Sequence, residues 1–305
     1  MSAAAEDEET LQRCASCGVA GSNDIKLMKC TACYLVKNCS VKCQKDHRKQ
    51  HKKECKKRAA ELHDELLFKQ PESTHLGDCP ICCLPLPIDP EKYTLNTCCS
   101  KRVCKGCNFA NQMREFEGRL EPKCPFCRKV LIDTEDEEQI ERLMKRVEAN
   151  DPVAICRVAT ESYIKGDYNA SFKYLTKAAA LGDAHGHFQI SALYREGRGV
   201  EKDENLALHH AEQAAIGRHH EARHNLGCFE WKNDQVDRAV KHWIIAAKLG
   251  AVKSLERLKT LLYKDGHVSK EDFESALRGH HSAIAATKSP QRDETAEYEM
   301  LRAER

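Results

Sequence analysis

Residues 14–55 read CASCGVAGSNDIKLMKCTACYLVKNCSVKCQKDHRKQHKKEC and hold eight soft metal ligands. Zinc is bound tetrahedrally by thiolates and imidazoles, and a gap of two residues lets both thiolates of a pair reach the same ion. Eight ligands therefore predict two closed zinc sites. In chain order the ligands are Cys14, Cys17, Cys30, Cys33, Cys39, Cys43, His51 and Cys55.

A stretch of this length cannot bury enough apolar surface to offset its chain entropy. Metal binding then has to supply the folding free energy, on the order of 10 kcal/mol for each structural zinc ion. Disulfides are the alternative use of so many cysteines, but they require an oxidising compartment. The start MSAAAEDEE has neither the basic nor the apolar region of a secretory signal. We therefore expect zinc rather than disulfides, and unfolding of this stretch when zinc is removed.

The spacing Cys33-x5-Cys39-x3-Cys43-x7-His51-x3-Cys55 resembles the MYND zinc finger along its whole length. The resemblance implies that the ligands interleave between two zinc ions, and it favours His51 as a ligand over its neighbour His47. It assigns Cys14, Cys17, Cys39 and Cys43 to one ion, and Cys30, Cys33, His51 and Cys55 to the other. A short proline-containing peptide is the ligand that the family implies.

The cysteines divide the chain of 305 residues, because 16 of the 18 lie between Cys14 and Cys127. The first part is therefore expected to be metal-stabilised, and the rest to fold by ordinary burial. The net charge of +2 indicates no particular partner and does not favour nucleic acid. No run of about 18 apolar residues exists, so we expect no membrane span and a cytoplasmic or nuclear protein. Residues 1–13 are acidic and lack aromatics, which favours disorder.

Residues 41–58 can form a helix that places Cys43, His51 and Cys55 at near-helical intervals. The lysines of this helix make a basic face with two interpretations. It is either a patch that attracts phosphates or an acidic protein segment, or an ordinary solvated surface. Residues 56–78 are predicted to be a linker whose first half is helical and which breaks at Pro71.

A second cysteine cluster occupies residues 79–128 and contains three further pairs with ligand spacing, together with two adjacent cysteines. This number of ligands again predicts two metal sites. The cysteines are Cys79, Cys82, Cys98, Cys99, Cys104, Cys107, Cys124 and Cys127.

The segments CPIC, CKGC and CPFCRK make this second cluster resemble a RING finger. The resemblance implies that the first and third pairs share one zinc ion and that the last pair belongs to a second zinc ion. The first site is then Cys79, Cys82, Cys104 and Cys107, and the second contains Cys124 and Cys127.

The middle of the cluster departs from the RING pattern. Lys101 stands at the usual histidine position, and a protonated lysine cannot bind zinc. The second site then uses both Cys98 and Cys99, or has three protein ligands, or is empty. We favour the use of both cysteines, so that this module holds one or two zinc ions. Cys83 is left over and is expected to be a small buried hydrophobe.

RING fingers that act as ubiquitin ligases have no nucleophile of their own. They hold a charged ubiquitin-conjugating enzyme so that a substrate lysine can attack its thioester. In such ligases an apolar residue in the first pair, a proline in the last pair and a basic residue after that pair contact the conjugating enzyme. Ile81, Pro125 and Arg128 stand at these positions. The alternative is a purely structural zinc module in which Ile81 packs into its own core.

The C-terminal half repeats itself. Residues 133–150 are predicted to be an amphipathic helix that joins it to the second cluster. Alanine-rich helices then end at Gly182, Gly217 and Gly250, at intervals of 35 and 33 residues. The phrase YREGRGVEKDENLAL makes these units resemble Sel-one-like repeats, which are relatives of tetratricopeptide repeats. The resemblance implies an α-solenoid of about four helix pairs over residues 152–287, with a concave side left for protein partners. A charged tail, residues 288–305, follows.

Histidines cluster in the repeats and raise the question of a further metal site. We interpret them as repeated surface positions, because they supply no ligand-like set of four. These histidines are His185, His187, His209, His210, His219, His220 and His224. The two remaining cysteines, Cys156 and Cys228, are expected in helix interfaces.

The expected fold is therefore mainly α, with two small zinc-stabilised modules followed by an α-solenoid. The predicted function is that of a RING-type ubiquitin-protein ligase that recruits a ubiquitin-conjugating enzyme, with the MYND finger and the repeats selecting protein substrates. The alternative is a non-enzymatic zinc-binding scaffold or adaptor that uses the same modules only to bind partner proteins or peptides.

Overall fold

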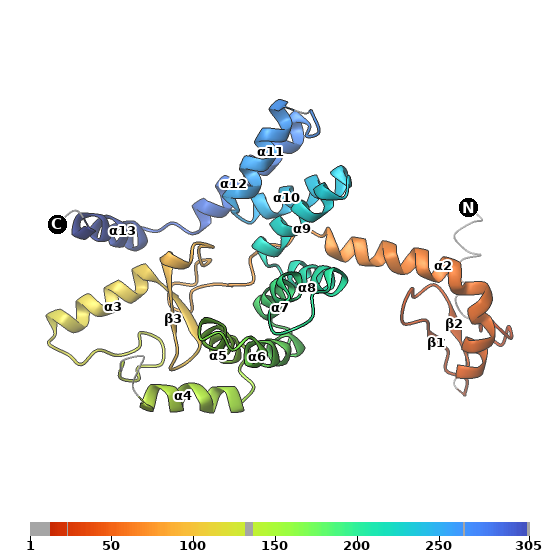
Figure 1. The fold of residues 1–305 in the computed structure, drawn as a ribbon, viewed down its shortest axis with the longest axis horizontal. Coiled ribbons are helices and arrows are strands. Elements are labelled where there is room, and N and C mark those ends of the chain that lie inside the picture. The colour runs from red at the N-terminus through yellow and green to blue at the C-terminus, as the bar shows by residue number, and fades with distance from the viewer. Residues whose placement is uncertain (1–12, 23, 132–136, 265, 304–305) are drawn as a thin grey trace. The chain divides into compact units, whose positions relative to one another are not determined.

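The computed structural model describes residues 13–22, 24–131, 137–264 and 266–303. The chain is mainly helical, as predicted, and forms two compact units, Met1–Lys69 and Gln70–Arg305 (Figure 1). The disorder predicted for residues 1–13 falls, except for Arg13, outside the described residues. Within the described ranges, no helix has both the length and the apolar character that a bilayer crossing requires.

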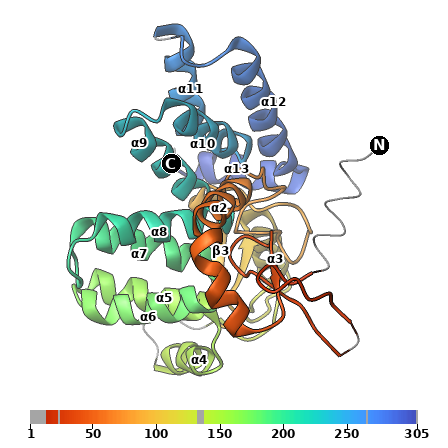
Figure 2. The ribbon, with the colours of Figure 1, turned by 90° about the vertical axis from the view of Figure 1, so that its right-hand side faces the viewer.

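The first unit consists of two short strands and one long helix. The strands β1 (Met28–Lys29) and β2 (Lys37–Asn38) pair antiparallel ahead of α2 (Val41–Leu67). Ser40 caps the helix, because its hydroxyl accepts a hydrogen bond from the N–H of Cys43 at 3.2 Å. The helix α2 continues without a break through the first half of the predicted linker (Figure 2). The helical half of that linker is therefore an extension of the finger's own helix.

The second cysteine cluster lies in the unit Gln70–Arg305 and is built on a hairpin. A 3-10 turn, η1 (Pro90–Lys92), leads into β3 (Tyr93–Asn96), which pairs antiparallel with β4 (Lys101–Cys104). The helix α3 (Lys105–Glu117) follows β4 directly. The turn of the hairpin and the start of α3 therefore hold cysteines on ordered elements.

The predicted connecting helix is present as α4 (Glu137–Glu148), and residues 133–136 of that prediction lie outside the described residues. Leu143 and Val147 on this helix pack into the apolar core of the first repeats. The helix therefore belongs to the solenoid's packing and is not a free linker.

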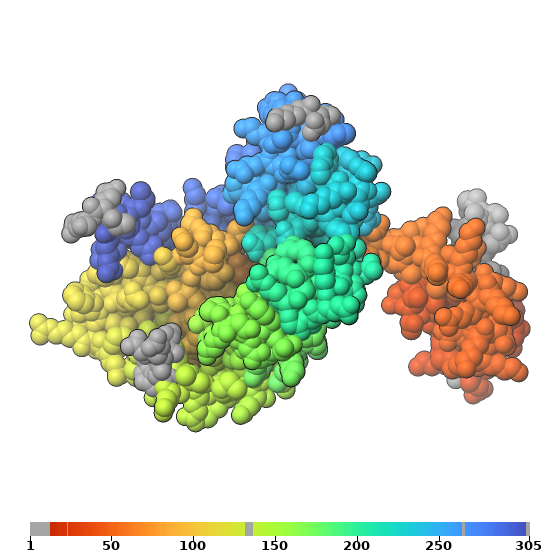
Figure 3. Space-filling view, in the orientation of Figure 1, coloured from red at the N-terminus to blue at the C-terminus, as the bar shows by residue number. Residues whose placement is uncertain are grey.

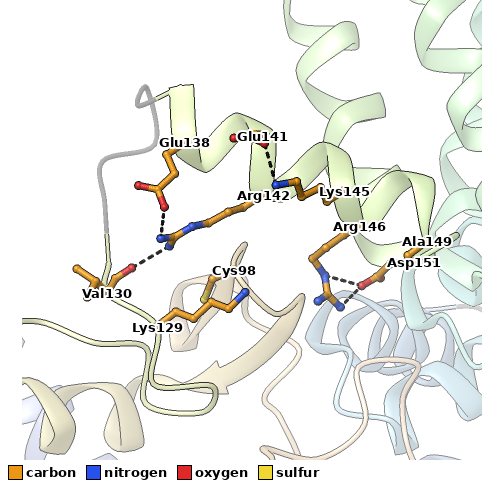
Figure 4. A pocket seen from close by; sticks show the side chains of 10 residues that line it. All are labelled: Cys98, Lys129, Val130, Glu138, Glu141, Arg142, Lys145, Arg146, Ala149 and Asp151. Carbon is orange, nitrogen blue, oxygen red and sulfur yellow. Dashed lines mark hydrogen bonds and ion pairs between the residues drawn. The ribbon is translucent and has the colours of Figure 1, made fainter.

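Two arginines of α4 also reach the second cysteine module, residues 79–130. Arg142 donates a hydrogen bond to the carbonyl oxygen of Val130 at 3.1 Å, and Arg146 donates one to the hydroxyl of Ser100 at 2.8 Å. Figure 4 shows both arginines along an open cavity of about 740 Å³ that is lined by α4 and this module. The helix thus contacts both of the parts that it was predicted to join.

Four antiparallel helix pairs follow and stack one beside the next (Figures 1 and 2). Aspartates begin several of the helices, because their carboxylates accept hydrogen bonds from free N–H groups of the first turn. These N-caps are Asp151, Asp167, Asp183 and Asp203. The helices are α5 (Pro152–Ile164), α6 (Tyr168–Ala180), α7 (Ala184–Glu196), α8 (Glu204–Ile216), α9 (His220–Lys232), α10 (Val236–Lys248), α11 (Val252–Lys264) and α12 (Lys270–Ala286).

Apolar clusters between neighbouring pairs hold the solenoid together. Cys156 lies in the cluster of the first pairs and Cys228 packs against that of the last pairs, so both occupy helix interfaces as predicted. Trp243 is completely buried in the second cluster, and its indole N–H donates to the carbonyl of His224 at 3.2 Å. Gly227 makes room for this ring, since a Cβ there would lie 2.5 Å from the indole nitrogen.

The charged tail forms a further helix, α13 (Pro290–Ala303), that packs against α3 (Figure 3). The rings of Phe109 and Tyr298 lie 4.8 Å apart between their centroids. Lys105 and Glu299 form an ion pair at 2.9 Å. The described part of the tail is therefore a helix docked on the second cysteine module.

Candidate metal centres

Four segments that begin with a cysteine pair fold into the same turn: residues 14–20, 30–36, 79–85 and 124–130. In each, the N–H four residues after the first cysteine donates to that cysteine's carbonyl oxygen, at 2.9 to 3.0 Å. This turn requires a positive φ at its fifth residue, and that residue is Gly18, Tyr34, Cys83 or Arg128. The turn directs both thiols of a pair to one side, which is the arrangement that a shared metal ion needs.

The finger brings its eight predicted ligands into two interleaved groups. The donor atoms of each group lie within 4.8 Å of one another. The sulfurs of Cys30 and Cys55 are 3.8 Å apart, and the Cys33 sulfur is 3.1 Å from Nε2 of His51. The groups are Cys14, Cys17, Cys39, Cys43 and Cys30, Cys33, His51, Cys55.

The helix α2 places the ligands of the second half of the finger. His51 and Cys55 are four residues apart and share one helix face. His51 is only 8% exposed. The ring of His47 stacks on it at 5.5 Å between centroids but does not belong to the donor group. The geometry therefore selects His51, the histidine that the family spacing favours.

The second cysteine module, defined here as residues 79–130, also forms two interleaved groups. The adjacent Cys98 and Cys99 sit in the turn of the β3–β4 hairpin and face the same group. Their sulfurs lie 3.4 Å from that of Cys127 and 3.8 Å from that of Cys124, respectively. Lys101 begins β4, and its amine lies over the ring of Phe126 at 5.9 Å from the ring centroid. The structure thus brings both adjacent cysteines into one donor group with Cys124 and Cys127.

The four turns that begin with a cysteine pair are called knuckles below. The other group of this module joins the knuckle of residues 79–85 to the start of α3. It consists of Cys79, Cys82, Cys104 and Cys107. The sulfurs of Cys82 and Cys104 lie 3.8 Å apart, and the N–H of Cys107 donates to the Cys104 sulfur at 3.4 Å. The hydrogen bond with Cys79 raises the pKa of Cys104, and the N–H of Cys107 at the helix start opposes this only in part.

The sulfur separations distinguish a metal site from disulfides. A tetrahedral zinc ion with Zn–S bonds of about 2.3 Å holds its sulfurs about 3.8 Å apart, whereas the sulfurs of a disulfide are about 2.05 Å apart. The contacts between cysteines within these groups measure 3.4 to 3.8 Å. All 18 cysteines are free. The four groups are therefore compatible with zinc binding.

Hydrogen bonds within each group favour one thiolate beside neutral thiols. Hydrogen bonding by Cys104 lowers the pKa of Cys79 to about 4, and the same contact raises the pKa of Cys104. Burial opposes ionisation of Cys14, but the backbone N–H groups of Cys17 and Cys39 lower its pKa to about 6. Hydrogen bonding to Cys17 raises the pKa of Cys39 to about 12. Three or four thiolates side by side therefore need a cation, and a divalent metal ion would supply it.

The three residues predicted to contact a conjugating enzyme lie in two of the knuckles. Ile81 is 41% exposed and does not pack into the module's core. Pro125 is half-buried, and Arg128 is exposed. The guanidinium of Arg128 donates to the Asn111 side chain at 2.8 Å and lies 3.6 Å from the carboxylate of Glu115.

Two expectations from the sequence were wrong. Cys83 is exposed and not a buried hydrophobe, because it occupies the left-handed position of its knuckle. His219 and His220 are buried, at 1% and 9% exposure, so the histidines are not all surface positions. These two histidines form a further donor group with His75, a residue of the predicted linker that no spacing pattern singled out.

Arg292 of α13 is a second residue that sequence reasoning missed. Its guanidinium donates to the sulfur of Cys82 at 3.2 Å and to the backbone carbonyl oxygens of Leu84 and Pro85, at 3.3 and 2.8 Å. A charged tail gives no sequence signal for such a contact, because it depends on where α13 packs.

Comparisons with known proteins agree with two of the modules. The MYND finger family model matches residues 14–55, and the Sel1 repeat model matches residues 153–183 and 184–219. Neither match covers the second cysteine module. A comparison with curated proteins gave no match.

Two solved structures illustrate the likeness. One is a Sel1 repeat protein from Oxalobacter formigenes, with 26% identity and a TM-score of 0.42 over 49% of this chain and 64% of that one. The other is a protective antigen of uropathogenic Escherichia coli strains that displays an SLR fold, with 16% identity and a TM-score of 0.37 over 63% of this chain and 40% of that one. This chain thus covers less than two thirds of either. Residues 14–55 are a MYND finger and the helix pairs of residues 153–219 are Sel1 repeats, two kinds of module that generally mediate protein–protein interactions.

Proposed function

We propose that this protein is a RING-type ubiquitin-protein ligase whose MYND finger and repeats bind protein substrates. The observation that supports the ligase function is the interleaving of two four-cysteine groups across the β3–β4 hairpin and α3. Interleaved sites tie the first and last knuckles to one rigid frame. That frame can present Ile81 and Arg128 together to a conjugating enzyme.

In this proposal the chain acts by positioning. The amine of a substrate lysine attacks the thioester carbonyl of the charged conjugating enzyme, an isopeptide bond forms, and the thiol of the conjugating enzyme leaves. Ile81 offers an exposed apolar contact and Pro125 a second one. Arg128 offers a planar donor that can bridge two carbonyl oxygens at once. To do so it must exchange its contacts with Asn111 and Glu115 for contacts with the other protein.

Zinc would act here as a structural ion. Two ions in the finger and two in the second cysteine module would hold the knuckles, and none takes part in the transfer. A cavity of about 450 Å³ lies between α2 and the knuckle at residues 30–36, with Val36, Lys45 and Arg48 among its lining residues. This cavity supports a short peptide as the finger's ligand. The proposed compartment is the cytoplasm or the nucleus.

The second candidate is a zinc-stabilised adaptor without transferase activity. One observation favours it: the Arg128 guanidinium is held inside its own module by Asn111 and Glu115. An arginine that keeps these partners is not available to bridge two other proteins. Under this alternative the MYND finger and the repeats still bind proteins, and the second module only supports the solenoid.

A self-ubiquitination assay with a panel of conjugating enzymes separates the two. The ligase predicts activity in the wild-type chain and its loss in Ile81→Ala and Arg128→Ala, with zinc content unchanged in both. Leu120→Ala is the matched control, because Leu120 is an exposed apolar residue of the same module outside the predicted contacts. If the folded, zinc-loaded wild-type chain is not ubiquitinated with any conjugating enzyme of the panel, the result would favour the adaptor.

A further inference from the structure

The segment before the second cysteine module is anchored on the corner between α8 and α9. The N–H of His75 donates to the carbonyl oxygen of Arg218 at 3.2 Å, and the Arg218 guanidinium donates to the hydroxyl of Ser73 at 3.0 Å. The ring of His75 stacks on that of His219 at 4.1 Å between centroids. A residue from the predicted linker thus joins two histidines at the start of α9.

These three histidines form a buried group of imidazoles. The donor nitrogens of His75, His219 and His220 all lie within 4.8 Å of one another. The Nδ1 atoms of His75 and His220 are buried and have no hydrogen-bond partner among the described residues. A buried polar atom without a partner destabilises the folded state. A ligand that accepts both lone pairs would remove that cost.

A fourth histidine borders the group. Nδ1 of His185 lies 3.2 Å from Nε2 of His219, and Gln189 contacts the other nitrogen of His185 at 2.6 Å. Two nitrogens on one tetrahedral zinc ion lie about 3.3 Å apart, since each Zn–N bond is about 2.0–2.1 Å. Nδ1 of His219 accepts a hydrogen bond from the N–H of Ala222 at 3.3 Å. The His219 ring thus has one contact at each nitrogen, with His185 at Nε2 and with Ala222 at Nδ1. Binding a metal ion would replace one of these two contacts by a metal bond.

The surroundings keep these rings neutral. Burial, with the neighbouring histidines and Arg102, lowers the pKa of His75 to about 3. Burial likewise lowers the pKa of His220 to about 4 and that of His219 further. Burial also lowers the pKa of His185, and Asp183 opposes this shift only in part. At neutral pH each imidazole is therefore uncharged and keeps one unprotonated ring nitrogen that can bind a metal ion.

We propose that His75, His219 and His220 bind a divalent transition-metal ion of the zinc class, with His185 or a water molecule in the fourth position. Neutral imidazoles suit zinc and its neighbours, and the absence of thiolates separates this site chemically from the four cysteine groups. The ion fastens the segment that contains His75 to the corner of the solenoid. Because Cys79 follows four residues later, the ion also fixes the first knuckle against the repeats.

The test compares the metal content of full-length chains after metal loading and removal of free ions. His75→Phe keeps an aromatic ring to stack on His219 but removes the donor nitrogens. The control is His210→Phe, because His210 pairs with His187 elsewhere in the solenoid. The expected result is one metal ion fewer in His75→Phe than in the wild type, and no change in His210→Phe.

A second measurement identifies the ligands. After reconstitution with cobalt, the absorption spectrum of His75→Phe is subtracted from that of the wild type. The difference should be a visible cobalt spectrum that lacks the thiolate charge-transfer bands of the cysteine groups. If circular dichroism shows that His75→Phe is unfolded, His220→Phe replaces it in both experiments. Equal metal content in the wild type and the folded variant would overturn the proposal and leave the histidines as a purely packed stack.

Discussion

The guanidinium of Arg292 donates a hydrogen bond to the sulfur of Cys82 at 3.2 Å, although 210 residues separate the two in the chain. Burial opposes the charge of Arg292, but its hydrogen bond with Cys82 and the nearby Cys104 raise its pKa above the usual value. A fixed positive charge beside a zinc-binding thiolate offsets part of the negative charge of a four-cysteine site. The tail helix α13 therefore contributes to the second cysteine module and is not an appendage.

We expect Arg292→Ala to weaken zinc retention at this one site. A hydrogen bond to a charged group contributes about 1.5–3 kcal/mol, and partial exposure reduces this to roughly a tenfold faster zinc release. A colorimetric chelator that follows zinc loss over time measures the effect. Arg302→Ala, on an exposed position of the same helix, should behave as the wild type. Identical release from Arg292→Ala and Arg302→Ala would show that the contact does not support the site.

We expect Cys83→Gly to stabilise the first knuckle. Cys83 has φ of 56°, is exposed and belongs to none of the four metal groups. A left-handed backbone costs a residue with a Cβ roughly 1–2 kcal/mol relative to glycine, so about 1 kcal/mol of stability should be gained. Chemical denaturation followed by near-ultraviolet signals measures it. Zinc content should stay at the wild-type value, whereas Cys82→Ser should lower it. Unchanged or reduced stability in Cys83→Gly would contradict this.

The spacing of the cysteines was sufficient to predict the knuckles. The turn around each cysteine pair is formed by hydrogen bonds inside a segment of seven residues, so it does not depend on distant parts of the chain. The same holds for the helix pairs, whose alanine-rich composition and terminal glycines are local signals. The turn at Cys98 and Cys99 was ambiguous, since whether adjacent thiols can face one group depends on the hairpin that carries them. The sequence pattern thus predicted the knuckles and the helices, because hydrogen bonds between residues close in sequence determine both.

The contacts of His75 and Arg292 could not be predicted in this way. Each depends on two segments far apart in sequence meeting in the folded unit, and neither residue stands in a periodic or spaced motif. The histidines of the repeats show the limit most clearly. Spacing suggested surface positions, but the packing of the linker onto the α8–α9 corner buries His219 and His220.

Chelation under reducing conditions should unfold the finger and spare the repeats. Among the described residues of the first unit, the buried apolar side chains are Cys14, Cys33 and Leu67, so little remains there once the metal is lost. The clusters of the repeats contain none of the cysteine ligands. Hydrogen exchange should show loss of protection in α2 and its retention in α7 and α8. Full protection of α2 after complete chelation would refute the metal-dependent folding of this unit.

Gly227→Ala should destabilise the solenoid, because the new methyl group would lie 2.5 Å from the indole nitrogen of Trp243. Overpacking of a buried ring costs about 1–3 kcal/mol, and here it also strains the hydrogen bond from the indole to His224. Thermal unfolding followed by circular dichroism measures the loss. In a Trp243→Phe background the smaller ring leaves space, so the same glycine change should cost clearly less there than in the wild type. Equal costs in the two backgrounds would mean that the indole is not the group that requires glycine at this position.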